Sequence, residues 1–169
     1  MRVAVIGTGA LGCIYAARLA RHAHVSMLGT WTQGIEAIRA GGINVVEGDG
    51  RMWRAVVPVY TDPVGVDGVD VALVLVKSYQ TARAAAWAGD LLEADGLAVT
   101  LQNGLDNYAA LSSAVGEDRA GVGVTYNGAT MLGPGEVHHV AHNLTYLGAT
   151  PVTEKRVAAF AQLLDRAGL

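Results

Sequence analysis

Cysteine is almost absent from this sequence of 169 residues, which contains only Cys13. A single thiol can form neither an intramolecular disulfide nor a metal site built from several thiolates. We therefore expect a protein of a reducing compartment, the cytoplasm. Cys13 follows a glycine-rich segment at the start of an expected helix, where a thiol pKa can fall, but we interpret it as a small buried side chain.

Charge of either sign is also scarce, at 16% of residues, and the net charge is -3. The chain therefore has no basic field that would attract a nucleic-acid backbone or an anionic membrane surface. No apolar run approaches the roughly 20 residues of a membrane-spanning helix, and glycines interrupt the apolar start of the chain too early for a signal peptide. We expect a protein that binds neither nucleic acid nor membrane.

Linkers and repeats are missing as well, since no segment rich in proline or serine divides the chain. Hydrophobic residues make up 51% of the sequence, which is enough for a packed core and argues against disorder. A chain of this length forms one domain of ordinary size. We expect residues 1–169 to be a single domain.

What the sequence does contain is an alternation of apolar, β-branched runs with helical segments. The run at 69–76 is apolar on both alternations, as in a central parallel strand covered on both faces. Ser78 and Thr153 are the expected caps of two helices. The alternation predicts an α/β fold of Rossmann type, with a doubly wound, mostly parallel sheet. Strands are expected at 1–6, 24–28, 69–76, 97–101 and 120–125, and helices at 10–22, 34–40, 78–93, 107–115 and 153–167.

Two hairpins are also expected. The first joins the runs 43–46 and 53–59 through Glu47-Gly48-Asp49-Gly50, which has turn composition. The second joins 137–140 and 144–147 around His142-Asn143.

The segment Gly7-Thr8-Gly9-Ala10-Leu11-Gly12 fits the pattern G-x-G-x-x-G between a strand and a helix. In this context Gly7 allows the tight turn, Gly9 lets a diphosphate approach the backbone, and Gly12 allows close packing of helix on strand. The helix dipole and the free amides then favour an anion. The pattern predicts a dinucleotide site, the alternative being a strand-to-helix turn without a ligand.

No acidic residue occurs in 27–33, the segment after the second expected strand. NAD sites commonly have Asp or Glu there to bind the ribose hydroxyls, so its absence weakens the case for NAD and permits the extra phosphate of NADP. No arginine stands there either. Thr30, Thr32 and Gln33 could donate neutral hydrogen bonds to that phosphate, or could belong to an ordinary exposed loop.

Four segments together resemble ketopantoate reductases in kind and order: RVAVIGTGALG, VLVKSYQT, LQNGLDN and GVTYNGATMLGPGEVHH. The resemblance covers nearly the whole chain. It implies an oxidoreductase that uses NADP(H) to reduce 2-dehydropantoate to pantoate, a step toward pantothenate.

Residue by residue, the resemblance makes Gly7 to Gly12 the diphosphate loop and makes Lys77 a cofactor contact. It makes Asn103 the residue that orients nicotinamide ribose and substrate, and places the backbone of Ala129 near the cofactor. The residues themselves agree on location, because Lys77 and Asn103 follow central strands at the sheet edge where open α/β folds bind ligands. A solvated strand end and a turn at Asn103-Gly104 are the alternatives. Gln80 lines the same cleft or lies on a helix surface.

The resemblance also implies a second, helical domain that supplies the lysine acting as general acid, and this sequence does not contain it. We therefore expect the chain to bind cofactor but to reduce a 2-keto acid poorly by itself, and to associate with a helical domain or with a second copy. Three alternatives stay open: a non-catalytic NADP-binding module, a reductase of another 2-keto acid, and a structural Rossmann-like domain.

Three histidines near the end of the chain, His138, His139 and His142, invite comparison with a metal site, with Glu136 close by. On a strand, however, His138 and His139 point to opposite faces. We expect no metal site and interpret these residues as polar residues of the second hairpin.

Overall fold

The computed structural model describes residues 1–104 and 106–169; Leu105, in the LQNGLDN segment, lies outside the described residues. The helices are α1 (Ala10–Leu19), α2 (Thr32–Gly41), α3 (Thr81–Leu91), α4 (Asp106–Val115) and α5 (Glu154–Ala167), with short 3-10 turns at Ser78–Gln80 and Glu117–Arg119. The strands are β1 (Arg2–Ile6), β2 (His24–Leu28), β3 (Ile43–Glu47), β4 (Met52–Ala55), β5 (Val59–Tyr60), β6 (Val69–Val74), β7 (Leu92–Thr100), β8 (Ala120–Thr125), β9 (Gly128–Gly133), β10 (Glu136–Ala141) and β11 (Thr145–Gly148).

The larger sheet has seven strands in the order β11-β8-β7-β6-β1-β2-β5. Its neighbours pair in parallel except β11, which pairs antiparallel with β8. From β1 the sheet grows in one direction through β2 to β5, and from β6 it grows in the other direction through β7 to β8. The sheet is therefore doubly wound, with its switch point between β1 and β6. The predicted Rossmann-type fold is confirmed.

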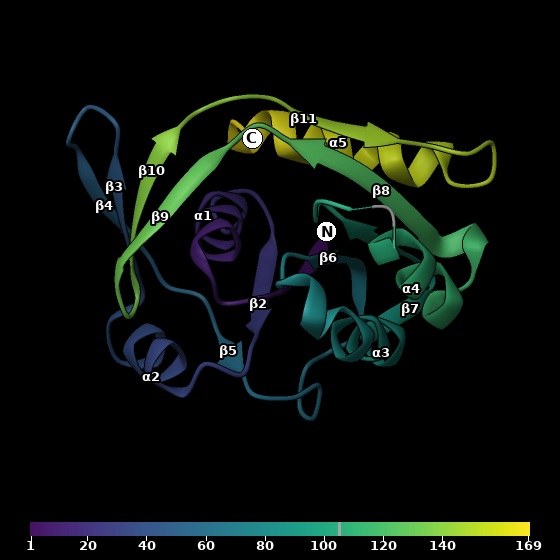
Figure 1. Cartoon of the computed structure of the whole chain (residues 1–169), viewed down its shortest axis with the longest axis horizontal. Coiled ribbons are helices and arrows are strands. Elements are labelled where there is room, and N and C mark those ends of the chain that lie inside the picture. The colour runs from purple at the N-terminus through teal and green to yellow at the C-terminus, as the bar shows by residue number, and fades with distance from the viewer. Residues whose placement is uncertain (105) are drawn as a thin grey trace.

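The core lies on both faces of this sheet. Along β1, Val3 and Val5 belong to one hydrophobic cluster, whereas Ala4 and Ile6 belong to another. The first cluster includes residues of α1 and α5, and the second includes residues of α3 and α4. Figure 1 shows α3 and α4 grouped away from α1. Burial on both faces explains why the central strands are almost continuously apolar.

A second sheet, which the sequence did not predict, has four strands in the order β4-β3-β10-β9. Strands β3 and β4 form the first expected hairpin, with Val45 opposite Trp53. The expected run 53–59 is wrong as a single strand, because β4 ends at Ala55 and β5 pairs with β2 in the other sheet. Packing of α1 against β9 and β10 joins the two sheets (Figure 1).

The second expected hairpin is wrong. Strand β10 pairs with β3 and β9, whereas β11 pairs with β8, so the chain crosses between the sheets at residues 125–128 and returns at 141–145. Asn127 stabilises this corner: its Oδ1 accepts a hydrogen bond from the backbone N–H of Asn143 at 3.2 Å, and its Nδ2 lies 3.2 Å from Thr125 Oγ1. Contacts between distant segments, rather than a local turn, therefore decide this connection.

Helix starts also differ from expectation. Ser78 does not cap a helix through its side chain; it begins a 3-10 turn, and α3 starts at Thr81. Thr153 holds the N-cap position of α5, but its hydroxyl bonds to Thr150 instead of to the helix amides. Within residues 1–104 and 106–169, no helix combines the length and apolarity that crossing a membrane requires.

Candidate functional site

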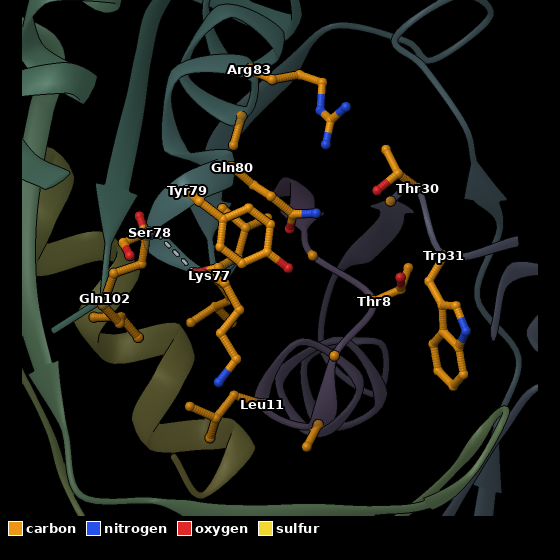
Figure 2. Close-up of a pocket in the computed structure, with 18 of the residues that line it drawn as sticks. Thr8, Leu11, Thr30, Trp31, Lys77, Ser78, Tyr79, Gln80, Arg83 and Gln102 are labelled. Carbon is orange, nitrogen blue, oxygen red and sulfur yellow. Dashed lines mark hydrogen bonds between the residues drawn. The ribbon is translucent and has the colours of Figure 1, made fainter.

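A cavity of about 540 Å³ lies at the carboxyl ends of β1, β2, β6 and β7, and we call it the edge cleft. Its position is the one where open α/β sheets bind ligands, and its size is that of a small-molecule site. Its lining residues are Gly7, Thr8, Gly9, Ala10, Leu11, Gly29, Thr30, Trp31, Leu75, Val76, Lys77, Ser78, Tyr79, Gln80, Arg83, Ala84, Trp87, Leu101, Gln102, Asn103 and Ala129. Figure 2 shows part of this lining, with Lys77 and Leu11 on one side and Thr30 and Trp31 on another.

The three glycines of the loop have different surroundings. Gly7 has φ +133°, a backbone conformation that residues with a side chain rarely adopt, and a Cβ added there would lie 2.6 Å from the carbonyl oxygen of Leu75. A side chain at this position would therefore both strain the backbone and clash with Leu75. A Cβ on Gly12 would lie 2.0 Å from Gly7 O. A Cβ on Gly9 would meet no atom within 4 Å, so this backbone faces the open cleft. Gly7 and Gly12 thus shape the loop, and Gly9 leaves room for a ligand.

Gly12 does not line the edge cleft, unlike the other five residues of the motif. Its effect on a ligand is indirect, through the position of Gly7. Thr32 and Gln33 also lie outside the lining, because α2 begins at Thr32 and carries both residues onto its first turn. Of the three neutral donors considered after the second strand, only Thr30 lines the cleft.

Lys77 and Asn103 lie far apart in sequence, but both line the edge cleft. Lys77 follows β6 and Asn103 follows β7, which is the neighbouring parallel strand. Both side chains are exposed. Together they offer an ammonium and an uncharged amide at the same edge, and the amide both donates and accepts. Ala129, from β9 of the smaller sheet, also lines the cleft.

A chain of hydrogen bonds that the sequence did not reveal supports this edge. Gln102 Nε2 donates to Val76 O and to Thr81 Oγ1, both at 2.8 Å. Thr81 Oγ1 donates to Asn107 Oδ1 at 2.8 Å, and Asn107 Nδ2 donates to the carbonyl oxygen of Asn103 at 2.6 Å. Thr81 and Asn107 are buried. These hydrogen bonds connect the segment after β6, the start of α3 and the Asn103 loop. They therefore position the groups that face the cleft.

The charges of the edge cleft are all positive among the described residues that line it. They belong to Lys77 and Arg83, and no Asp or Glu is present in that lining. Sequence reasoning missed Arg83 because it lies on α3, 53 positions after Thr30. In a chain with a net charge of -3, the cleft is thus a local concentration of positive charge, which favours an anionic ligand.

Cys13 lies behind the loop and is fully buried, as expected. Burial raises the pKa of its thiol to about 12, so the thiol is protonated and unreactive at neutral pH.

The histidines near the end of the chain do not behave as polar hairpin residues. His139 is buried, and potential ligand atoms of Glu47, His139 and His142 lie within 4.8 Å of one another. Arg18 occupies this cluster: its Nη2 lies 2.8 Å from Glu47 Oε1 and 3.0 Å from His139 Nδ1. A guanidinium at that point repels a metal cation, so Arg18, Glu47 and His139 form a buried polar network around the Arg18–Glu47 ion pair, and His142 lies exposed beside it.

Comparison with known families gives a match over most of the chain. The family described as "Ketopantoate reductase PanE/ApbA" matches residues 3–151. A 2-dehydropantoate 2-reductase from Halobacterium salinarum is 37% identical over 172 aligned positions, which cover 100% of this chain and 56% of that protein.

Solved structures share the fold. The 2-dehydropantoate 2-reductase from Geobacter metallireducens superimposes with a TM-score of 0.87 at 31% identity, covering 100% of this chain and 56% of that one. D-mandelate dehydrogenase, solved with NADH and anilino(oxo)acetate, gives a TM-score of 0.92 at 22% identity, which shows the shared fold alone. The chain therefore spans little more than half the length of these relatives.

Proposed function

Since the chain belongs to the ketopantoate reductase family, we propose that it is the NADP(H)-binding half of an oxidoreductase that reduces 2-dehydropantoate to pantoate. The observation that carries this proposal is the edge cleft. There the glycine loop, Lys77 and Asn103 converge from three parallel strands at one edge of the sheet.

The residues of the cleft fit a nicotinamide dinucleotide. The open space above Gly9 leaves room for the diphosphate beside the backbone, and the N-terminus of α1 adds a favourable dipole. Gly7, Thr8, Gly9, Ala10 and Leu11 would surround the diphosphate, while Thr30 and Ala129 would lie near other parts of the cofactor. When bound, the reduced nicotinamide supplies a hydride for the ketone carbon of the substrate.

The phosphorylated cofactor suits this cleft better than NAD. An NAD site typically uses a carboxylate to bind the ribose hydroxyls, and the described lining contains none. Lys77 and Arg83 instead supply positive charge for a more anionic ligand.

Asn103 is the residue of this chain that we assign to the reacting groups. Its amide can donate to the substrate and accept from the nicotinamide ribose without changing charge. Hydride transfer leaves negative charge on the ketone oxygen, and a proton donor must neutralise it. We assign that donor to the part of the relatives that this chain does not span, so the chain alone should bind cofactor with little turnover.

An exposed apolar surface favours association. Val122 and Val124 on β8 are 41% and 50% exposed, and Tyr146 on β11 is 58% exposed. Adjacent apolar side chains on a sheet surface commonly mark an interface. We propose that a helical domain or a second copy of the chain covers these side chains. We also propose that the protein is cytoplasmic.

Isothermal titration calorimetry with NADPH and NADH tests the cofactor assignment. We expect the chain to bind NADPH more tightly, Gly9→Asp to abolish binding, and Lys77→Ala to weaken it roughly tenfold, the scale of one charged hydrogen bond. Lys155→Ala removes the only other lysine, which is exposed on α5, and should leave affinity unchanged.

Oxidation of NADPH with 2-dehydropantoate, followed by absorbance, then tests the substrate. A folded chain that binds neither nucleotide contradicts the proposal. Faster NADPH oxidation with another 2-keto acid than with 2-dehydropantoate, measured after adding the part of the relatives that this chain does not span, would reassign the substrate and leave the cofactor assignment standing.

A further inference from the structure

Arg83 is a charged residue of the edge cleft for which the described structure shows no ion-pair partner. It lies on the first turn of α3 and lines the cleft together with Gly29, Thr30 and Trp31, which follow β2. In Figure 2 its guanidinium points across the cleft toward Thr30. Two elements that are distant in sequence thus place a cation and a hydroxyl on opposite sides of one opening.

Trp87 contacts the guanidinium of Arg83. It lies one helical turn after Arg83, and the Arg83 Cζ atom is 5.7 Å from the centre of its ring. This distance lies within the cation–π range, and such a contact with the ring leaves the N–H groups of the guanidinium available to a ligand. Within residues 1–104 and 106–169, neither a hydrogen bond nor an ion pair occupies the donors of Arg83.

The opposite wall lacks an acid, and two of its three residues, Gly29 and Thr30, are small. Thr30 is exposed, and Gly29 is close enough to Thr8 that a Cβ there would lie 2.5 Å from its side chain. A phosphate between the two walls could therefore accept hydrogen bonds from the guanidinium and from the Thr30 hydroxyl without meeting a carboxylate. Arginine suits this task because its planar fork donates two parallel hydrogen bonds to one phosphate.

We propose that Arg83, with Thr30 opposite it, binds the ribose 2′-phosphate of NADP and sets the preference for NADP over NAD. This inference rests on the proposed function, since it needs the dinucleotide in the edge cleft. In many NADP-binding Rossmann folds an arginine near the end of the second strand takes this phosphate. Here residues 29–33 are Gly-Thr-Trp-Thr-Gln, and α3 provides the arginine instead.

Calorimetry with two pairs of probes tests the inference: NADPH against NADH, and 2′,5′-ADP (adenosine 2′,5′-bisphosphate) against 5′-AMP. We expect Arg83→Gln to weaken NADPH and 2′,5′-ADP roughly 10- to 100-fold, the range of a charged hydrogen bond. The affinities for NADH and 5′-AMP should change by less than about twofold, since neither carries the 2′-phosphate. Lys155→Gln removes the same charge from exposed α5 and should change none of the four affinities.

A rescue variant separates binding from folding. Thr30→Arg in the Arg83→Gln background restores an arginine beside the same opening and should recover most of the NADPH preference, and circular dichroism confirms that each variant is folded. Equal losses for NADPH and NADH, or an unchanged NADPH preference in Arg83→Gln, would overturn the role of Arg83 while leaving the dinucleotide site intact. Failure of the unmodified chain to bind either nucleotide would overturn this inference and the proposed function together.

Discussion

At the scale of single residues, the glycine loop separates folding from binding. Gly12→Ala places a Cβ 2.0 Å from Gly7 O, a contact with backbone that no side-chain rotation can relieve. Gly9→Ala places a Cβ in open space. We expect Gly12→Ala to lower the unfolding free energy by about 2 kcal/mol or more, as overpacking does. Gly9→Ala should keep the stability and lose nucleotide affinity.

Urea denaturation and calorimetry on the two variants measure these effects. The informative control is Gly133→Ala on β9, where an added Cβ also meets nothing within 4 Å but the position lies outside the edge cleft. It should change neither stability nor binding strongly. Equal stability losses for Gly9→Ala and Gly12→Ala would contradict this division of roles.

Single residues also show what could be predicted from the sequence and what could not. The glycine motif follows from a local pattern, whereas the roles of Lys77 and Asn103 come from the resemblance to ketopantoate reductases, with which their positions after two strands agree. The structure places all of them except Gly12 at one cleft, and their roles in binding stay predictions. Arg83 was not predicted, since only the fold brings the first turn of α3 opposite Thr30. The support that Gln102 gives through Thr81 and Asn107 is likewise a contact between three separate elements.

At the scale of elements, a buried ion pair joins α1 to the smaller sheet. Arg18 Nη2 donates to both carboxylate oxygens of Glu47, at 2.8 and 2.9 Å, and Trp53 Nε1 donates to Glu47 Oε1 at 2.7 Å. The Arg18 and Glu47 side chains are only 10% and 11% exposed. Burial lowers the pKa of Arg18, and the Glu47 carboxylate opposes this effect. The pair therefore keeps the guanidinium charged inside the molecule.

Glu47→Gln should therefore destabilise the protein by about 3 kcal/mol in urea denaturation, because it leaves a buried cation without its counter-charge. Replacing both partners, with Arg18→Met and Glu47→Leu, should recover much of that loss. Asp49→Asn weakens the exposed pair with Arg51 and should have no measurable effect on stability. If Glu47→Gln were as stable as Asp49→Asn, the buried pair would not contribute to joining the sheets.

Strand boundaries were predictable where a local run of apolar residues marks a strand. The strand at 69–76 was expected from its apolar run, and β6 covers Val69–Val74. The smaller sheet was missed because β3 and β10, which pair side by side, lie about 90 residues apart in sequence. His142-Asn143 has the composition of a turn, yet it carries the chain from one sheet to the other. Turn-like residues do not reveal which strand comes next to which.

At the scale of the whole molecule, the joint between the two sheets should make stability depend on pH. His139 Nδ1 lies 3.0 Å from Arg18 Nη2, which can only donate, so Nδ1 accepts and Nε2 donates to Asn127 Oδ1 at 3.1 Å. The ring is therefore neutral in the folded protein. Burial, then the nearby charges of Arg18 and His142, lower the pKa of His139 from 6.5 to about 4, with Glu47 opposing the shift.

In the unfolded chain His139 becomes protonated as the pH falls below its ordinary pKa of 6.5, whereas in the folded protein it becomes protonated only at about pH 4. Between these pH values the unfolded state therefore binds one more proton than the folded state. The unfolding free energy should therefore be highest near neutral pH and fall as the pH drops from 6.5 toward 4, by roughly 3 kcal/mol in total. Urea denaturation at several pH values measures this slope. His139→Gln should be less stable at pH 7 but should show a shallower fall, whereas His24→Gln, at an exposed position, should keep the full slope. If the unfolding free energy of His139→Gln fell with pH as steeply as that of the unmodified protein, other groups would cause the acid sensitivity. The contacts between the two sheets would then not depend on pH.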